Sequence, residues 1–387
     1  MIQRACFGRL RILCPQAVYS LKGDTLLFFF RFLPELREIC IKIFMNFIFG
    51  GYKSNVIVSK GIPSIDSITN KFDNALIIAD ENTAGIASKI CGGNYIPHCV
   101  IKSGEENKTW RSVETILSSA VTNKLGRDCI FIAAGGGVIC DISAFAASVY
   151  MRGCNLALVP TTLLAMVDAS VGGKTGFDFC GIKNLAGTFY PAENIYIPVD
   201  CLSSLPQREW KSGFAEIIKT AILANDFFDQ LDGISSFDYK SDALLSCIEK
   251  AVAYKGKIVT EDPRESGGRR ILLNLGHTFA HALESVLGLG NISHGEAVAW
   301  GIIRACRLGV KLGITGESRA KKITGLIKKF GYESEYNCDK AALIGFMKND
   351  KKKRDGKLAF IVPDEKSAAA VTLEKENDLK ILEEILV

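Results

Sequence analysis

The composition is that of a globular protein with room for two domains. The chain has 387 residues, 48% of them apolar, which is enough to build full-sized cores. The 47 basic and 42 acidic side chains are spread along the chain, and the formal net charge is only +5. A nucleic-acid partner requires clustered basic residues, and no apolar run approaches the roughly 18 uninterrupted residues of a membrane-spanning helix. We therefore expect neither nucleic acid nor membrane as a partner, and an anionic small molecule as substrate.

The cysteines indicate a reducing compartment. Their number, 13, is odd, and no Cys-x-x-Cys pair occurs. Many lie in apolar segments such as 128–131, where a free thiol packs as a small hydrophobic group. The sequence therefore predicts free thiols and a cytoplasmic protein rather than a disulfide framework.

Residues 1–50 differ in character from the rest of the chain. They are basic and poor in acids at first, and two apolar runs follow, 26–33 and 39–49, each interrupted by a basic residue. We treat them as an extension of uncertain status. The preferred hypothesis is an upstream extension with Met45 as the working initiator, and the alternative is an organellar transit peptide.

Residues 51–205 follow an α/β pattern. Short apolar segments that read as strands are interspersed with a helical segment, which is typical of a domain built on a parallel sheet. The predicted strands are 55–58, 74–80, 95–101, 129–134 and 156–159, and the predicted helix between them is 110–125.

A glycine triplet, Gly135-Gly136-Gly137, follows the strand 129–134, and we expect a helix from Ile142. In this arrangement backbone amides can approach a pyrophosphate at a helix N-terminus. A tight turn also uses such glycines, and the spacing is not that of the usual dinucleotide fingerprint. Asp80, at the end of an earlier strand, is a candidate for a ribose hydroxyl or for a helix N-cap.

Two further glycine-bearing loops carry isolated lysines. Lys174 lies within 167–176, and Lys183-Asn184 follows soon after. The first loop lacks the spacing of a nucleotide-binding phosphate loop. Backbone amides and single lysines suit an anionic ligand.

Residues 206–387 predict a mainly helical second domain, with helices over 208–225, 241–260, 277–288 and 295–314 and a short strand over 357–362. The lysine-rich run 348–357 reads as a solvated loop, or as a source of one phosphate-facing lysine.

Three of the four histidines gather in the second domain, at His277, His281 and His294. Histidines four residues apart share one face of a helix, and Glu216 and Lys219 share a face of another. A packed or capping pair is the alternative to a metal site. The concentration of imidazoles favours a catalytic Zn²⁺ that keeps one position open for substrate. Since the glycine triplet lies in the first domain, we expect the active cleft between the two domains.

Taken together, seven motifs resemble 3-dehydroquinate synthase, in order and from about residue 52 to the end of the chain. They are 135–141, 150–153, 160–165, 171–175, 215–219, 274–281 and 294–296. The resemblance implies a homodimer with an N-terminal NAD⁺-binding α/β domain and an all-α C-terminal domain that binds Zn²⁺ or Co²⁺. It also implies conversion of 3-deoxy-D-arabino-heptulosonate 7-phosphate to 3-dehydroquinate and phosphate, in the shikimate pathway to aromatic amino acids. The steps would be transient oxidation by NAD⁺, loss of phosphate, re-reduction and an intramolecular aldol.

The resemblance also implies roles for single residues. The metal ligands would be Glu216, His277 and His294, with His281 handling a proton and Lys219 beside the reacting hydroxyls. The substrate phosphate would be held by Lys174, Asn184 and Lys351, with Arg152 supplied by the partner subunit. The substrate carboxylate would be held by Lys255, Arg270 and Asn274, with Arg269 as an alternative to Arg270, and a hydroxyl by Asp168. The contacts to NAD⁺ would come from Asp80, Asn82, Glu105, Lys108, Gly135, Gly136, Gly137, Val138, Asp141, Thr161, Thr162, Lys174 and Lys183.

Three other functions compete with this interpretation. A sister cyclase would act on sedoheptulose 7-phosphate or glucose 6-phosphate, which carry no carboxylate for Arg270 to bind. A metal-dependent polyol dehydrogenase would release NADH and need no phosphate-binding lysines. An inactive NAD-binding regulator should have lost His281, Lys219 or a metal ligand, and the sequence retains all of them.

Overall fold

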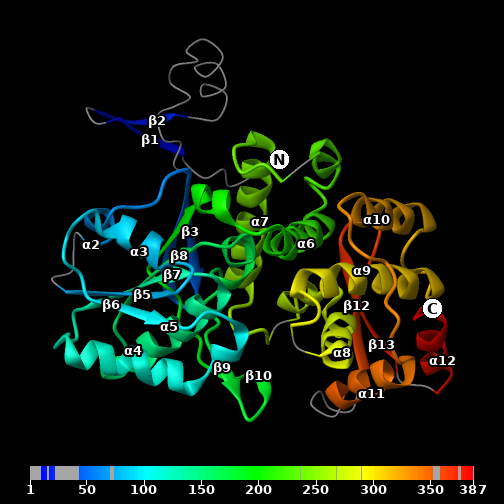
Figure 1. Cartoon of the computed structure of the whole chain (residues 1–387). Helices are drawn as coiled ribbons and strands as arrows, with labels where there is room; N and C mark the ends of the chain where they lie inside the picture. The colour runs from blue at the N-terminus through cyan, green and yellow to red at the C-terminus, as the bar shows by residue number, and fades with distance from the viewer. Residues whose placement is uncertain are drawn as a thin grey trace. The chain divides into compact units, whose positions relative to one another are not determined.

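The computed structural model describes residues 10–14, 17–21, 43–69, 74–235, 237–266, 268–288, 290–351, 358–373 and 376–386 (Figure 1). It divides into two compact units, Met1–Ser204 and Leu205–Val387. Of the predicted extension, the apolar run 26–33 lies outside the described residues. The second run, 39–49, contributes strand β3, Ile43–Phe49, and a separate antiparallel pair is formed by β1, Leu10–Cys14, and β2, Ala17–Leu21.

A seven-stranded sheet forms the centre of the first unit. Its order is β3-β4-β11-β8-β7-β5-β6, with β3 antiparallel to β4 and the other neighbours parallel. The central strand β7 is buried along its whole length, and its neighbours β8 and β5 are buried at all but one residue each, as expected for a parallel sheet covered on both faces. The bounds are β4 Tyr52–Ser59, β5 Ala75–Asp80, β6 His98–Ile101, β7 Ile130–Gly135, β8 Asn155–Pro160 and β11 Asn194–Pro198.

Helices cover both faces of this sheet (Figure 1). The short α2, Ile65–Thr69, and α3, Ala84–Cys91, lie on one face, and α4, Trp110–Thr122, and α5, Gly137–Val149, on the other. Ile68 of α2 and Ile90 of α3 pack in one cluster with Ile77, Ile132 and Val159 of the sheet. A small antiparallel hairpin, β9 Phe177–Phe179 with β10 Ile182–Ala186, stands apart from the sheet.

Each of the predicted strands of the first domain coincides with an observed one, but one predicted boundary is wrong. Helix α5 begins at Gly137 instead of Ile142. The strand can pass directly into the helix because Gly135 has no side chain; a Cβ there would lie 2.6 Å from Cβ of Ile139. The strands β3, β9, β10 and β11 were not predicted.

The second unit is helical with one β-hairpin. Its long helix α9 is buried over most of its length and packs against α6, α8 and strand β12. The predicted strand 357–362 is observed as β12, and its partner β13, which begins with three alanines, was not predicted; the domain is therefore helical but not entirely so. The bounds are α6 Gln207–Ala224, α7 Asp242–Glu261, α8 His277–Leu287, α9 His294–Lys311, α10 Glu317–Lys329, α11 Lys340–Lys351, α12 Glu376–Ile385, β12 Leu358–Pro363 and β13 Ala368–Leu373.

Short helical turns connect these elements, and several carry predicted site residues: Glu105–Asn107, Tyr150–Arg152, Ala165–Ala169, Val199–Ser204, Asp229–Gly233 and Arg270–Asn274. The cysteines from Cys91 to Cys338 are free thiols, most of them buried, as predicted for that part of the chain. Within the described ranges, no helix combines the length and the apolar character that crossing a bilayer requires.

Candidate active site

Three predicted ligands meet in the second unit. Glu216 lies in the middle of α6, His277 opens α8 and His294 opens α9. Oε1 of Glu216 is 3.7 Å from Nε2 of His277 and 3.6 Å from Nε2 of His294. One ligand atom from each residue lies within 4.8 Å of those from the other two. Three side chains distant in sequence therefore converge on a point.

The backbone holds His294 close to the helix that carries Glu216. Ser293 and Glu296 form a capping box that starts α9 at His294. The next residue, Gly295, donates its N–H to Oγ of Ser212 in α6 (3.2 Å), and a Cβ at Gly295 would lie 2.2 Å from the carbonyl oxygen of Ser212. The spacing between α6 and α9 thus depends on a glycine, and with it the distance between the two ligands.

The three residues fit a metal ion. Both carboxylate oxygens of Glu216 are buried: Oε2 pairs with Lys219, and Oε1 faces the two histidines. A buried carboxylate requires compensating positive charge, which a metal ion at Oε1 would add to that of Lys219. Nδ1 of His277 donates to the carbonyl oxygen of Leu275 (3.2 Å), which turns Nε2 toward Glu216. One carboxylate and two imidazoles leave a fourth position open in a tetrahedral Zn²⁺ site.

The electrostatics of the triad are strongly coupled. Burial first, and Lys219 second, lower the pKa of His277 to about 3. Burial also opposes charge on His294, but Glu216 and Glu284 outweigh it and raise the pKa of His294 to about 9. Although burial works against it, Lys219 and then the two histidines hold the pKa of Glu216 well below its ordinary value. His277 is thus neutral and can ligate directly, whereas His294 has to lose a proton.

His281 and Lys219 lie beside the triad. The ring of His281 is 5.6 Å from that of His277 and 6.4 Å from that of His294, measured between centroids. His281 is not one of the three residues whose ligand atoms converge. Nζ of Lys219 contacts Oε2 of Glu216 and is almost fully buried. Both side chains therefore lie directly beside the three ligand residues.

The two adjacent arginines have different environments. Arg270 is 3% exposed, and its guanidinium donates to the carbonyl oxygen of Pro263 (2.5 Å). The side chain of Arg269 is 57% exposed and pairs with Glu261 at 2.6 Å. Asn274, one turn after Arg270, donates to Oε1 of Glu265 (2.9 Å). The structure favours Arg270 over Arg269 as the buried cation.

The structure places the side chain of one further predicted residue of this unit, Lys255, but not that of another, Lys351. Lys255, buried in α7, belongs to the helix that packs against the turn Arg270–Asn274. Lys351 ends α11, and its side chain lies outside the described residues.

In the first unit, the glycine turn forms the N-terminus of α5. Gly136 is the N-cap, so the amides of Gly137 and Val138 belong to the first turn, where backbone N–H groups lack helical partners. A Cβ at Gly136 would lie 3.2 Å from Cγ2 of Thr162, and the buried hydroxyl of Thr161 has no hydrogen-bond partner. This combination suits the close approach of a phosphate-bearing cofactor.

Asp80 organises a turn at the end of β5. Its Oδ1 accepts from the backbone N–H groups of Asn82 and Thr83, both at 2.9 Å. Thr83 is the N-cap of α3. Asp80 therefore supports the turn that leads into α3. This role resembles the predicted N-cap, although Thr83 and not Asp80 is the N-cap residue.

A second cluster gathers around Lys108. Its Nζ donates to Oδ2 of Asp141 (2.6 Å) and to Oδ1 of Asn184 (2.5 Å). Glu105 belongs to the same environment and helps to stabilise the positive charge of Lys108. Three other predicted residues lie in nearby segments of the chain. Lys183 precedes Asn184 in β10, and Lys174 pairs with Phe189 in an isolated antiparallel β-bridge. Asp168 lies in the helical turn Ala165–Ala169.

Comparisons with known proteins decide the family. The N-terminal family model of 3-dehydroquinate synthase matches residues 98–212 and the C-terminal model matches 213–353. A 3-dehydroquinate synthase from Prochlorococcus marinus (strain NATL1A) is 40% identical over 270 residues, 68% of this chain and 73% of the relative. The chain belongs to the 3-dehydroquinate synthase family.

Further relatives agree with this family. A 3-dehydroquinate synthase from Nostoc punctiforme is 36% identical over 313 residues, 79% of this chain and 86% of the relative. The fold is that of 2-deoxy-scyllo-inosose synthase, solved with carbaglucose-6-phosphate, NAD⁺ and Co²⁺ (TM-score 0.78, 23% identity, 89% of this chain and 99% of that one). It is also that of 2-epi-5-epi-valiolone synthase from Streptomyces hygroscopicus, with NAD⁺ and Zn²⁺ (TM-score 0.76, 24% identity, 86% and 96%). The predicted family and fold class are confirmed.

The dehydroquinate synthase motifs omit two acidic residues that the structure places at the site. Oε1 of Glu284 lies 3.7 Å from Nδ1 of His294, and Glu265 accepts the hydrogen bond from Asn274. Glu284 follows His277 by seven residues, so both share one face of α8. An acid on the same helix face as His277 was therefore a sequence signal that could have identified Glu284. Glu265 lies in an irregular loop, and no periodic pattern could have identified it.

Proposed function

We propose that this protein converts 3-deoxy-D-arabino-heptulosonate 7-phosphate to 3-dehydroquinate and phosphate, using NAD⁺ as a catalyst that is reduced and regenerated. The convergence of Glu216, His277 and His294 carries the proposal, because it supplies a metal site next to a proton-handling histidine. The family to which the chain belongs supports the same activity.

The side chains around the triad have complementary roles in this reaction. A bound Zn²⁺ or Co²⁺ would act as a Lewis acid that lowers the pKa of a secondary alcohol, and NAD⁺ would accept and return the hydride. Lys219, buried against Glu216, would orient the reacting hydroxyls. His281 would accept or donate the proton that moves when phosphate leaves. In the first unit, the first turn of α5, Thr161 and Asp141 would hold NAD⁺.

Buried Arg270 favours an acid substrate over a plain sugar phosphate. A guanidinium binds a carboxylate through two parallel hydrogen bonds, and Lys255 and Asn274 would complete that site. Asp168 would bind a substrate hydroxyl, and Lys174, Asn184 and Lys351 would bind the phosphate. A sister cyclase acting on sedoheptulose 7-phosphate is the second candidate, since the solved structures of similar fold include two sugar-phosphate cyclases.

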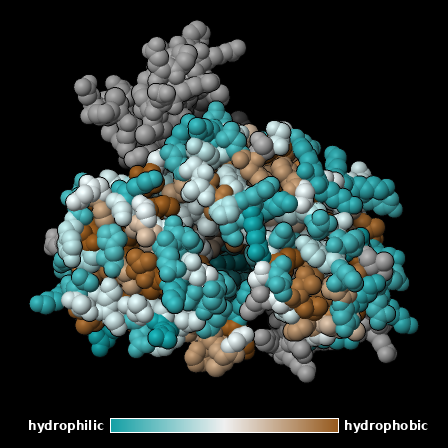
Figure 2. Space-filling model, in the orientation of Figure 1, coloured by the Kyte–Doolittle hydropathy of each residue, from teal (hydrophilic) through white to brown (hydrophobic). Residues whose placement is uncertain are grey.

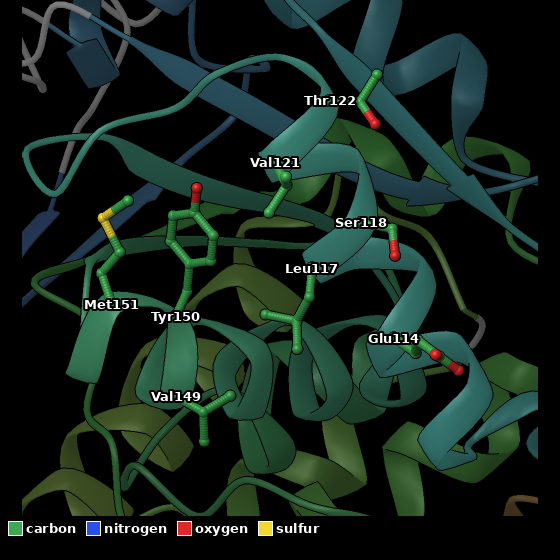
Figure 3. Close-up of a pocket in the computed structure, with 8 residues that line it drawn as sticks. All are labelled: Glu114, Leu117, Ser118, Val121, Thr122, Val149, Tyr150 and Met151. Carbon is green, nitrogen blue, oxygen red and sulfur yellow. The ribbon is translucent and has the colours of Figure 1, made fainter.

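We propose a second copy of the chain as the protein partner. A groove of about 440 Å³ lies between α4 and the end of α5, lined by the residues labelled in Figure 3. Exposed Val121, Val149 and Met151 contribute apolar surface to it, and Arg152 follows Met151 directly. A homodimer formed over this surface would cover the apolar side chains and offer Arg152 to the substrate of the partner. A cytoplasmic location stays a prediction from the free thiols.

The decisive experiment offers the purified protein 3-deoxy-D-arabino-heptulosonate 7-phosphate and NAD⁺, and follows release of inorganic phosphate. We expect turnover without accumulation of NADH, loss of turnover after treatment with a chelator, and recovery with Zn²⁺ or Co²⁺. Turnover with sedoheptulose 7-phosphate alone would identify the sister cyclase. Steady formation of NADH would identify a polyol dehydrogenase.

A further inference from the structure

Lys108 is a buried cation that connects two groups of proposed ligands within the first unit. Its side chain donates to Asp141 in α5 and to Asn184 in the hairpin β9–β10. Helix α5 carries the glycine turn at its N-terminus, whereas Asn184 is expected to hold the substrate phosphate. One ammonium group therefore links a cofactor-binding helix to a phosphate-binding strand.

The chemistry of this contact fixes the orientation of the Asn184 amide. An ammonium group has donors and no acceptor, so the atom of Asn184 that faces Lys108 has to be the carbonyl oxygen Oδ1. The backbone N–H of Asn184 donates to Oδ1 of Asp178 (2.8 Å). The amide nitrogen Nδ2, which can only donate, then points away from Lys108. An anion such as phosphate requires donors of this kind.

The backbone around Asn184 gives this side chain little other support. Ile182, Lys183, Asn184 and Leu185 of β10 are all exposed, and Figure 2 shows apolar residues at the surface of the hairpin. Asn184 has a φ of +52°, in the left-handed region that asparagine tolerates better than most residues. Strand β9 is better anchored, because Phe177 is buried and Asp178 donates its N–H to the carbonyl oxygen of Lys108 (2.7 Å). Lys108 thus holds both strands, β9 by its backbone and β10 by its side chain.

Lys108 keeps its charge in this position. Burial alone lowers the pKa of Lys108, but the negative charge of Asp141, followed by those of Glu105 and Asp178, outweighs burial and raises it above the ordinary value. A charged donor forms a stronger and more directional hydrogen bond than a neutral one.

We propose that Lys108 is a positioning residue that couples the cofactor-binding helix to the phosphate site, by holding the Asn184 amide with Nδ2 turned toward the substrate phosphate. This inference rests on the proposed function, which assigns the phosphate to Asn184. It adds that Lys108 acts on phosphate binding through Asn184 rather than by touching the phosphate. It also predicts that replacing either residue should damage the same step.

A double-mutant cycle tests this coupling, with inorganic phosphate as the probe. The variants are Lys108→Met, Asn184→Ala and the two combined, and Lys102→Met removes an exposed lysine of the same region as a control. The inhibition constant of phosphate is measured at saturating NAD⁺, and NAD⁺ affinity separately by calorimetry. Each single substitution should raise the inhibition constant of phosphate roughly 10- to 100-fold, as expected for a lost hydrogen bond to a charged group. The double variant should bind phosphate as well as the single variant with the lower affinity. Lys102→Met should bind phosphate normally.

Independent losses that multiply in the double variant would overturn the proposal, because Lys108 would then act without Asn184. Asn184→Asp tests the orientation while leaving buried Lys108 with an anionic partner, so it guards against misfolding of Lys108→Met. Its carboxylate offers no donor to phosphate, and we expect at least the loss seen with Asn184→Ala. Phosphate binding at the wild-type level in Asn184→Asp would also overturn the proposal.

The cycle separates failure of this inference from failure of the proposed function. If the function is wrong, the unmodified protein releases no phosphate from the heptulosonate and is not inhibited by phosphate. If only the inference is wrong, the unmodified protein is active and inhibited by phosphate, but the cycle is additive.

Discussion

Glu284 illustrates how a residue outside the ligand triad can determine its properties. Its carboxylate lies 3.7 Å from Nδ1 of His294, on the side of the ring opposite Glu216. A carboxylate in this position fixes the orientation of a ligating imidazole and makes it more basic. We therefore expect Glu284 to support metal binding without touching the metal.

Removing the charge of Glu284 should weaken metal binding without removing a ligand. For Glu284→Gln we expect Zn²⁺ affinity to fall roughly 10- to 100-fold, measured by competition with a chromophoric chelator. Glu317→Gln, an exposed glutamate of α10, serves as the matched control and should bind Zn²⁺ normally. Equal Zn²⁺ affinity in the Glu284 variant and the unmodified protein would show that the carboxylate does not support His294.

The arginine pair gives a prediction with a built-in control. Arg270→Ala should raise KM for the heptulosonate at least about tenfold, because a charged hydrogen bond to the substrate carboxylate is lost. Arg269→Ala should change KM by less than about twofold, since an exposed ion pair contributes little. Thermal unfolding of both variants checks that buried Arg270 is not needed for folding. A larger effect at Arg269 than at Arg270 would reverse the assignment.

At the residue scale, the sequence was informative where several motifs combined. The motifs could name Glu216, His277 and His294 because each lies in a recognisable segment. They could not separate Arg269 from Arg270, since adjacent residues differ in burial only once the turn Arg270–Asn274 is folded. The link from Lys108 to Asn184 was also beyond prediction, because it joins residues distant in sequence across an irregular hairpin.

At the scale of elements, helix α7 contains a half-buried acid that costs stability. Burial first, and Asp242 second, raise the pKa of Glu249 to about 7. The folded state therefore binds a proton that the same side chain in the unfolded chain, with its ordinary pKa of 4.5, has already lost. Between these two values stability falls as the pH rises, and above pH 7 the full penalty is present.

Replacement of this acid by its amide should stabilise the protein in alkaline solution. We expect Glu249→Gln to raise the free energy of unfolding at pH 8 by about 1–2 kcal/mol, allowing for partial exposure of the side chain. At pH 4 the gain should vanish. Chemical denaturation at both values measures it, with Glu333→Gln, an exposed acid of the same unit, as control. A gain that is equal at both pH values would have a cause other than ionisation.

The elements themselves were predicted best where periodicity was strong. Helices α6, α7 and α9 carry a continuous apolar face, and their expected ends lie within a few residues of the observed ones. The start of α5 was missed because glycines normally break helices, whereas here the triplet lets a strand turn directly into one. The hairpin β9–β10 is short and mostly exposed, so it leaves no alternating pattern.

At the scale of the whole molecule, the proposed dimer makes a prediction about shared active sites. Met151 and Arg152 both have positive φ, +48° and +68°, which is uncommon for residues with a side chain. Such strain is characteristic of functional sites. We therefore expect Arg152 to have a functional role, and the proposed dimer would place that role in the site of the neighbouring subunit.

Mixed dimers can test this sharing directly. Arg152→Ala and His281→Ala should each be nearly inactive alone. Co-expressed with different tags, they should recover activity, because one site of each heterodimer has an intact His281 and receives Arg152 from the partner. Random pairing gives about a quarter of the normal number of sites in a C₂ dimer. A mixture as inactive as its components would mean that Arg152 acts within its own chain, or that no dimer forms.

The close contact of Gly295 with Ser212 has a consequence for which ions the protein can use. Because the close approach of Gly295 to Ser212 fixes the spacing of α6 and α9, we expect Glu216 and His294 to keep their separation whether or not an ion is bound. The affinity for an ion then depends on how well its radius fits this fixed spacing of donor atoms, because the protein does not rearrange around it. Exchange between Zn²⁺ and Co²⁺ should accordingly leave the helices unmoved, whereas a bulkier residue at position 295 would alter this selectivity by forcing α9 away from α6.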